Sequence, residues 1–111
     1  MGTNTRKLKK INKVALQPNL ADALFPKVRQ RVLAVLLGQP ERSFYTTEVI
    51  GLAQSGSGAV QRELTALTDA GLLTVTKLGA QKHYQANEDS PVFMELHLLV
   101  MKTMNVAAQS T

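Results

Sequence analysis

The side chains with the clearest capacity for chemistry lie on one face of a helix expected near the middle of the chain. In the stretch TTEVIGLAQSGSGAVQRELTALTDAGL, residues 46–72, apolar residues recur at the i, i+4 and i+7 spacing of one buried helix face: Val60, Leu64 and Leu67. The outward positions carry hydrogen-bonding side chains, among them Gln61, Arg62 and Thr65. Small polar residues precede them, and either Ser55 or Ser57 is able to cap the helix start.

A shorter helix is predicted before this one, and a tight turn separates the two. Thr46 or Thr47 is expected to cap it, and Glu48 lies in its first turn, where the helix dipole favours an acid. Its inward face is predicted to carry Val49, Leu52 and Ala53. After the second helix, Gly71 suits a left-handed C-cap, in which Leu72 would contact the last buried leucine. This arrangement predicts a helix-turn-helix, in which the N-terminal part of the second helix enters the major groove of DNA.

Residues 72–87 predict a β-hairpin, because two alternating runs flank the pair Gly79-Ala80. With a two-residue loop, the opposed pairs are Leu78 with Gln81, Lys77 with Lys82, Val75 with Tyr84 and Leu73 with Ala86. Like charges directly opposite each other destabilise a hairpin, so a phosphate between the two lysines would relieve their repulsion. The alternative is that both lysine side chains extend into water, which costs little at an exposed tip.

The remaining elements predict one domain, mainly α with a small β-hairpin (α+β). Residues 1–18 are expected to form a basic flexible arm, residues 19–104 the folded domain, and residues 105–111 a frayed tail. A short helical turn is predicted over residues 20–25 and an edge strand over residues 43–45. A helix is predicted over residues 27–37, with these residues facing inward: Val28, Val32, Val35 and Leu36.

A last helix is predicted over residues 91–104, with Ser90 as its cap. Its apolar residues form a broad stripe: Phe93, Leu96, Leu99, Val100 and Met104. This is more apolar surface than a small domain needs from a terminal helix, and exposed patches of this size usually mark partner surfaces. We therefore expect the stripe to form a homodimer interface; the alternative is packing against the helix at residues 27–37.

The net charge of the chain and its placement indicate what kind of partner the protein binds. The net charge is +5, and the first fourteen residues carry five basic residues and no acid: Arg6, Lys7, Lys9, Lys10 and Lys13. The other eight basic residues balance the eight acids, so the arm carries the whole excess. A basic arm raises affinity for polyanions such as DNA without choosing a sequence. The alternative is a solvated tail that only aids solubility.

Several classes of function are disfavoured. The chain has no cysteine, which excludes disulfides, thiolate metal sites and cysteine nucleophiles. We find no nucleophile–base set, paired catalytic carboxylates, phosphate loop or cofactor motif, so neither an enzyme nor a cofactor is expected. His97 with Glu95 falls short of the three or four ligands that zinc requires, so no metal site is predicted. No apolar run reaches the ~18 residues of a membrane span, and no export signal is visible, so a cytoplasmic location is expected.

The predicted order of elements resembles that of the ArsR-type winged helix-turn-helix transcription regulators. The resemblance covers about residues 22–103, and four segments carry it: VLAVLL at 32–37, GAVQREL at 58–64, DAGLL at 69–73 and YQAN at 84–87. More narrowly, the chain is similar to a branch of small prokaryotic regulators, some found next to or fused with nucleotidyltransferase domains. It departs from the metal-sensing members, which use cysteines or paired histidines and acids.

The resemblance implies a homodimer that binds double-stranded DNA, with a recognition helix at about 57–70 and a wing at about 72–87. The residues it places at DNA, with Gly79 at the wing tip, are Ser55, Ser57, Ala59, Gln61, Arg62, Thr65, Lys77, Gln81 and Lys82. Glutamine pairs bidentately with adenine and arginine with guanine. Alternatives for Arg62 are a phosphate contact or a salt bridge near Glu63 or Asp69. An alternative function is a winged-helix protein-interaction module that partners another protein, such as a nucleotidyltransferase.

Overall fold

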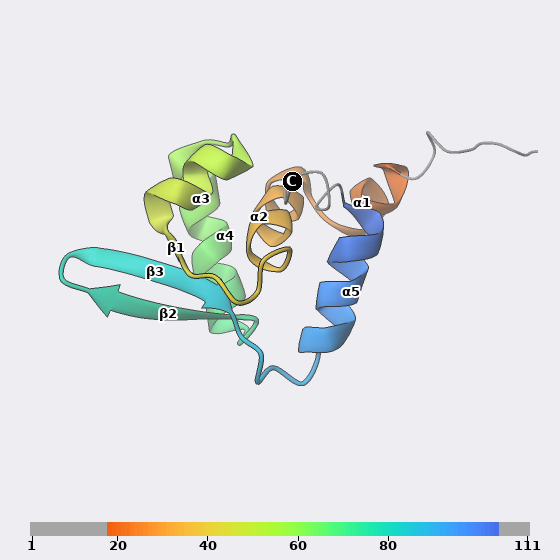
Figure 1. The fold of residues 1–111 in the computed structure, drawn as a ribbon. Coiled ribbons are helices and arrows are strands. Elements are labelled where there is room, and N and C mark those ends of the chain that lie inside the picture. Colours follow the sequence, from red (N-terminus) through yellow and green to blue (C-terminus); the bar gives the residue numbers. More distant parts are fainter. Residues whose placement is uncertain (1–17, 105–111) are drawn as a thin grey trace, which may run out of the picture.

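The computed structural model describes residues 18–104, which form five helices and a three-stranded antiparallel sheet (Figure 1). In chain order the elements are α1 (Pro18–Leu24), α2 (Lys27–Leu36), β1 (Phe44–Tyr45), α3 (Thr46–Ala53), α4 (Ser57–Asp69), β2 (Leu73–Leu78), β3 (Gln81–Ala86) and α5 (Phe93–Thr103). The predicted class, a mainly helical α+β domain, is confirmed. The predicted arm and tail fall outside the described residues, except that Pro18, assigned to the arm, begins α1.

The core lies where α2 and α4 pack together and meet the sheet. The buried faces predicted from helical spacing are confirmed: α2 buries Val32, Val35 and Leu36, and α4 buries Val60, Leu64 and Leu67. Leu33 of α2 is buried as well, and Phe44 of β1 is fully enclosed between the helices and the sheet. Removing this much apolar surface from water is the main force that holds α4 in its orientation.

A three-residue turn, Gln54 to Gly56, joins α3 to α4. Gln54 adopts a left-handed conformation with φ of 52°, which ends α3 and reverses the chain direction. From α2, Arg31 donates hydrogen bonds through Nη1 to the Gln54 carbonyl oxygen at 3.2 Å and to Ser55 Oγ at 3.3 Å. The turn is therefore tied to α2 just before α4 begins.

The predicted capping residues at the helix starts were wrong. Tyr45 occupies the N-cap of α3 in place of either threonine, and its N–H donates to Glu48 Oε1 at 2.9 Å. Gly56 occupies the N-cap of α4 in place of either serine, and it offers no side-chain hydrogen bond. The N-cap of α5 is Val92, whose N–H donates to Ser90 Oγ at 3.3 Å, so Ser90 closes a turn and α5 begins at Phe93.

The predicted end of α4 is confirmed. Gly71 has a φ of 82°, a conformation that glycine adopts without a steric penalty. The N–H of Leu72 donates to the Leu67 carbonyl at 2.9 Å, and that of Gly71 donates to the Thr68 carbonyl at 3.0 Å. These two bonds form a Schellman motif, which satisfies carbonyls at the helix end and directs the chain into β2.

The sheet has the strand order β1-β3-β2, with both pairings antiparallel. The predicted hairpin register is confirmed at every pair named, from Leu73 with Ala86 to Leu78 with Gln81. Tyr84 and Ala86 of the central strand β3 are buried, whereas Val75, directly opposite Tyr84 on the outer strand β2, remains 42% exposed. The outer half of the hairpin projects beyond the helices (Figure 1).

One predicted inward-facing residue, Leu52, and one predicted dimer contact, Val100, need correction. Leu52 is 56% exposed, because the buried stripe of α3 runs through Val49 and Ala53. On α5, Val100 is fully buried in the core of the same chain, so it offers no surface to a partner. Three more residues of the expected dimer stripe pack against this core: Phe93, Leu96 and Met104. The remaining one, Leu99, is half-buried and does not belong to the core cluster.

Candidate nucleic-acid interface

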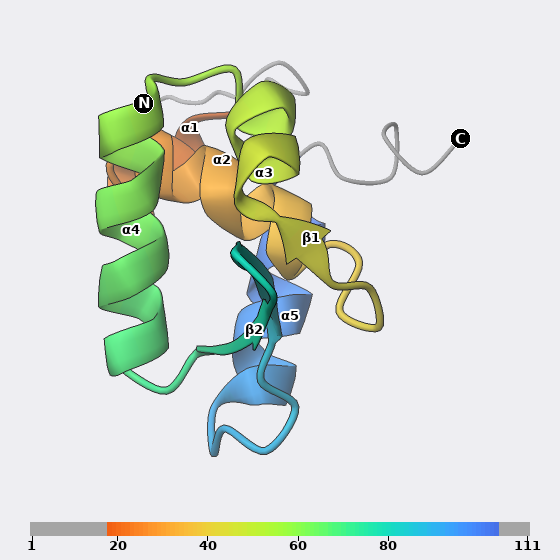
Figure 2. The same ribbon diagram turned by 90° about the vertical axis from the view of Figure 1, so that its left-hand side faces the viewer.

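One face of the molecule is hollowed between α3, α4 and the hairpin tip. Figure 2 looks toward this side, with α4 standing along one edge, α3 above and the hairpin pointing out of the page. The hollow is an open cleft of about 390 Å³. Residues predicted to contact DNA line it from two elements: Ser57, Gln61 and Thr65 from α4, and Gln81 and Lys82 from β3. We call this hollow the polar cleft.

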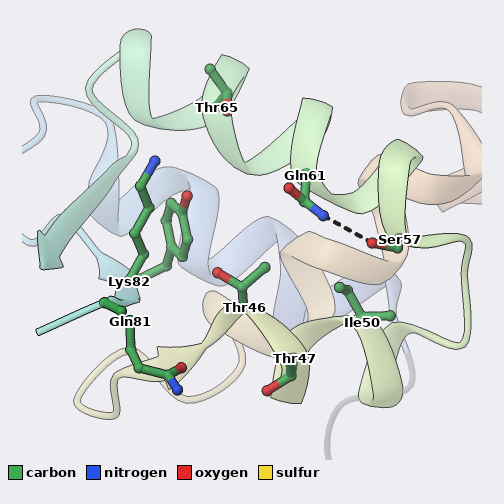
Figure 3. Close-up of a pocket in the computed structure, with 10 residues that line it drawn as sticks. Thr46, Thr47, Ile50, Ser57, Gln61, Thr65, Gln81 and Lys82 are labelled. Atoms are coloured by element: carbon green, nitrogen blue, oxygen red, sulfur yellow. Dashed lines mark hydrogen bonds between the residues drawn. The ribbon is translucent and has the colours of Figure 1, made fainter. Parts of the chain in front are cut away.

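Gln61 and Ser57 form a bonded pair at the start of α4. Both side chains are exposed, and Gln61 Nε2 donates a hydrogen bond to Ser57 Oγ at 2.8 Å (Figure 3). Residues four apart lie one above the other on a helix, so the pair is local to α4. The bond leaves the Gln61 carbonyl oxygen, Oε1, as the acceptor that faces the cleft side of the helix.

Other predicted residues on and near α4 lie outside the cleft lining. Ser55 serves the turn, because its hydroxyl donates to the Ala53 carbonyl oxygen at 3.0 Å and accepts from Arg31. Ala59 is half-buried. Arg62 is exposed, and its side chain runs back along α4 toward Gly58. Its Nη1 atom would lie 3.5 Å from a Cβ atom placed on that glycine.

The salt bridge considered for Arg62 is absent among residues 18–104. The neighbouring Glu63 is bound instead by Arg29 of α2, whose Nε lies 2.7 Å from Glu63 Oε1. This ion pair is half-buried and joins α2 to α4 across the core edge. Within the described residues Arg62 therefore presents its guanidinium to solvent on the exposed face of α4.

The hairpin contributes lysines on the side that faces the helices. Lys77 and Lys82 are paired directly across the two strands, as predicted, and both are exposed. Lys82 lines the polar cleft and points toward α4, whereas Gln81 points away from that helix (Figure 3). The structure therefore brings Lys82 beside α4 and leaves Lys77 outside the lining. Gly79 turns the tip with a φ of 63°.

Charges are unequally distributed around this face. Three ion pairs are found within residues 18–104, and their cations lie on α2 and in the loop before β1: Lys27 with Asp22, Arg29 with Glu63, and Arg42 with Glu48. None of the described residues that line the polar cleft is acidic. The pKa of Asp22 is lowered by its hydrogen bond from Gln30 and by Lys27, at a position on α1 rather than at the cleft. Lys82 is the one charged side chain among the described residues that line the cleft.

The two histidines make contacts inside the fold. His97 Nδ1 lies 2.7 Å from the Leu37 carbonyl oxygen at the end of α2, and its ring stacks on Phe93 with centroids 5.8 Å apart. His83 lies on the opposite face of the hairpin from Tyr84, with its ring centroid 3.9 Å from that of Tyr45. Residues 18–104 contain no cluster of three or more histidine, cysteine or acidic side chains able to hold a metal ion.

Sequence reasoning missed part of the lining. Thr46 and Thr47 in the first turn of α3, Ile50 one turn later and Tyr84 of β3 all border the polar cleft. The sequence predicts the threonines as helix caps and Tyr84 as the cross-strand partner of Val75, and neither role implies a binding site. The hairpin register did place Tyr84 on the same face as Lys82, two residues away, and this was the available signal.

Comparisons with known proteins provide no relative. No protein-family model, no curated protein and no solved structure matches the chain. In the part of the chain that the structure describes, every helix is too short or too polar to cross a bilayer.

Proposed function

We propose that this chain is a sequence-specific DNA-binding transcription regulator of the winged helix-turn-helix class. In this proposal α4 is the recognition helix in the major groove, and the β2–β3 hairpin is the wing on the backbone or in the minor groove. In this proposal the protein binds DNA in the cytoplasm. The supporting observation is that the exposed start of α4 and Lys82 of the hairpin border one cleft whose described lining carries no acid. A basic or neutral face lined with hydrogen-bond donors suits a phosphate backbone and base edges.

The element order from α2 to α5 supports the narrower assignment to an ArsR-type regulator. The three-residue turn between α3 and α4 and the two-residue hairpin tip are the connections that such a domain requires. In this assignment Gln61 and Arg62 contact bases, and Lys77, Gln81 and Lys82 contact the adjoining backbone. Arg62, which makes no ion pair within residues 18–104, is available for guanine or for a phosphate.

The proposed active form is a homodimer. The outer face of α5 leaves Met94, Leu98 and Met101 at 55%, 48% and 40% exposure, and these residues repeat at helical spacing. We propose this face as the contact between two copies, because most of the apolar stripe predicted from the sequence packs in or against the chain's own core. Pairing of two copies would place the recognition helices in successive major grooves, roughly 34 Å apart.

The proposal is tested by fluorescence anisotropy across a salt series. A labelled fragment from upstream of the gene is compared with unrelated DNA of equal length. We expect tighter binding to the upstream fragment and affinity for both that falls steeply with salt, because phosphate contacts release counterions. Equal and weak binding to both fragments would contradict sequence-specific regulation.

A second candidate function is a protein-interaction module, for which a nucleotidyltransferase is one possible partner. The same exposed residues of α5, together with Leu20 and Leu24 of α1 at 52% exposure each, favour it. An apolar interface of this kind holds its affinity as salt rises, whereas DNA binding does not. The salt series therefore discriminates between the two functions.

A further inference from the structure

The polar cleft contains a set of groups that suits one particular part of a DNA ligand. Thr46 stands in the cleft between Lys82 on one side and the Ser57–Gln61 pair on the other (Figure 3). The groups are a lysine ammonium, hydroxyls and an amide, which donate hydrogen bonds or carry positive charge. Phosphate oxygens accept such bonds, and lysine binds phosphate as a point charge.

A bound anion near the hairpin tip would also reduce a repulsion between two lysines. Lys82 sits directly opposite Lys77, and cross-strand pairs of like charge are unfavourable. The nearest candidate acid on α3, Glu48, does not line the cleft. Its two carboxylate oxygens are occupied by Arg42 at 2.7 Å and by the Tyr45 N–H at 2.9 Å. The lysine pair therefore has no neutralising partner among the described residues of the cleft.

Tyr84 adds a third, independent feature. Its side chain lines the cleft although the residue is only 6% exposed. The side-chain hydrogen bonds found for the hairpin strands within residues 18–104 come from Thr74 and Gln85, and none uses the Tyr84 hydroxyl. Within residues 18–104 the Tyr84 hydroxyl is not one of the buried polar atoms that lack a partner, so it reaches the surface of the cleft and is able to donate to an acceptor placed there.

We propose that the polar cleft seats a single phosphate of the DNA backbone, with Lys82, Thr46 and Tyr84 as its principal ligands. This inference rests on the proposed function and deepens it, because it assigns α3 and Tyr84 to the interface. The phosphate lies between the helix that reads bases and the hairpin tip, so α4 and the hairpin engage one and the same strand. The cleft thus sets the position of α4 along the duplex, and Gln61 meets its base in a fixed register.

The test compares lysine variants that lose the same charge at different places. Lys82→Gln removes the proposed phosphate contact, and Lys102→Gln on α5 is the matched control, exposed and far along the chain. Affinity for an unrelated duplex is measured by anisotropy over a salt series for the full chain. The slope of log K against log salt is negative, and we expect its magnitude to decrease by about 0.9 per protomer in Lys82→Gln, because one phosphate contact is lost. The slope for Lys102→Gln stays at the wild-type value.

Neutral variants probe the other two ligands. Thr46→Val keeps the branched shape of the side chain, and Tyr84→Phe keeps the ring, while each removes one hydroxyl. Each variant is expected to weaken binding about two- to tenfold without changing the salt slope, because one neutral hydrogen bond is lost and no counterion is involved. Thermal unfolding followed by circular dichroism shows that each variant is folded before its affinity is compared.

The outcomes separate the inference from the function beneath it. If the wild-type chain shows no salt-dependent binding to duplex DNA, the proposed function fails. If the wild type binds but Lys82→Gln and Lys102→Gln have equal slopes, the phosphate seat alone is wrong. Inorganic phosphate, titrated against chloride at equal ionic strength and followed by amide NMR shifts at Thr46 and Lys82, tests a free anion. Saturation by phosphate with unaltered DNA binding in Lys82→Gln would overturn the assignment to the DNA backbone.

Discussion

Gln61 donates a hydrogen bond through Nε2 to Ser57 Oγ at 2.8 Å, one turn earlier on α4. The bond uses one amide proton and holds the side chain against the helix. A free glutamine offers both a donor and an acceptor to adenine, whereas a restrained one presents chiefly its carbonyl oxygen. If α4 is the recognition helix, as proposed, Ser57 determines which groups of a base Gln61 is able to meet.

The first prediction concerns this pair. In Ser57→Ala the Gln61 amide is released, and base preference at one position of the site should relax by about five- to tenfold, while affinity for unrelated DNA is unchanged. Selection from a random duplex pool, followed by anisotropy on the selected site and its single-base variants, measures this. Gln61→Ala is the reference, and Ser57→Ala should have no effect in that background. An additive effect of the two substitutions would show that Ser57 acts by itself.

A second prediction concerns base contacts on α4. Replacing Gln61 and Arg62 together by alanine should abolish preference for the specific site while leaving the fold and oligomeric state intact, because both side chains are exposed. Each contact is worth roughly 1–3 kcal/mol of discrimination. Anisotropy on specific and unrelated duplexes, with sedimentation as the check on assembly, measures the change. Unaltered affinity for the specific site would remove α4 from the role of recognition helix.

The hairpin was predictable from sequence because its register depends on few variables. A two-residue loop at Gly79-Ala80 leaves one way to pair the strands, and alternation selects the buried face. The buried faces of α2 and α4 were equally accessible, since each carries a single periodic stripe. In both cases residues close together in the sequence determine the structure, and packing of the core agrees with these local preferences.

Other features required the third dimension. On α5 apolar residues surround most of the helix, so periodicity could not tell which side the core would cover. The fold buries the side with Val100 and exposes the side with Leu98. The polar cleft was equally inaccessible, because Thr46 and Lys82 belong to different elements and are brought together only when β1 and β3 pair. Helix starts were misassigned because the threonine and serine hydroxyls do not cap them: the Glu48 carboxylate accepts from the Tyr45 N–H at the start of α3, and Gly56 begins α4 without a side-chain cap.

The third prediction tests the link between α2 and α4. Arg29 Nε lies 2.7 Å from Glu63 Oε1, with the carboxylate side chain only 19% exposed. Arg29→Ala should lower the free energy of unfolding by about 1 kcal/mol, because the substitution leaves the half-buried Glu63 carboxylate without its partner. Partial screening of the pair by solvent keeps the loss this small. Urea unfolding measures this value. Lys27→Ala, which breaks the exposed pair with Asp22, is the control and should change stability by less.

The last prediction contrasts the two faces of α5. Val100 is fully buried, so Val100→Ala should lower the free energy of unfolding by about 2 kcal/mol through lost apolar contact and a cavity. Leu98 is 48% exposed, and Leu98→Glu should leave that free energy within about 0.5 kcal/mol for the monomer. If the outer face joins two copies, Leu98→Glu places like charges across the contact and yields monomers in sedimentation equilibrium.

Folding and assembly then respond to different residues of the same helix. A Val100→Ala chain that remains folded should still dimerise at low temperature, because its outer face is intact. A Leu98→Glu chain should bind a specific DNA site more weakly, since two linked recognition helices gain affinity that one alone lacks. Wild-type chains that sediment as monomers would contradict the proposed homodimer, and Leu98→Glu chains that still dimerise would place the contact elsewhere than on the Met94, Leu98 and Met101 face.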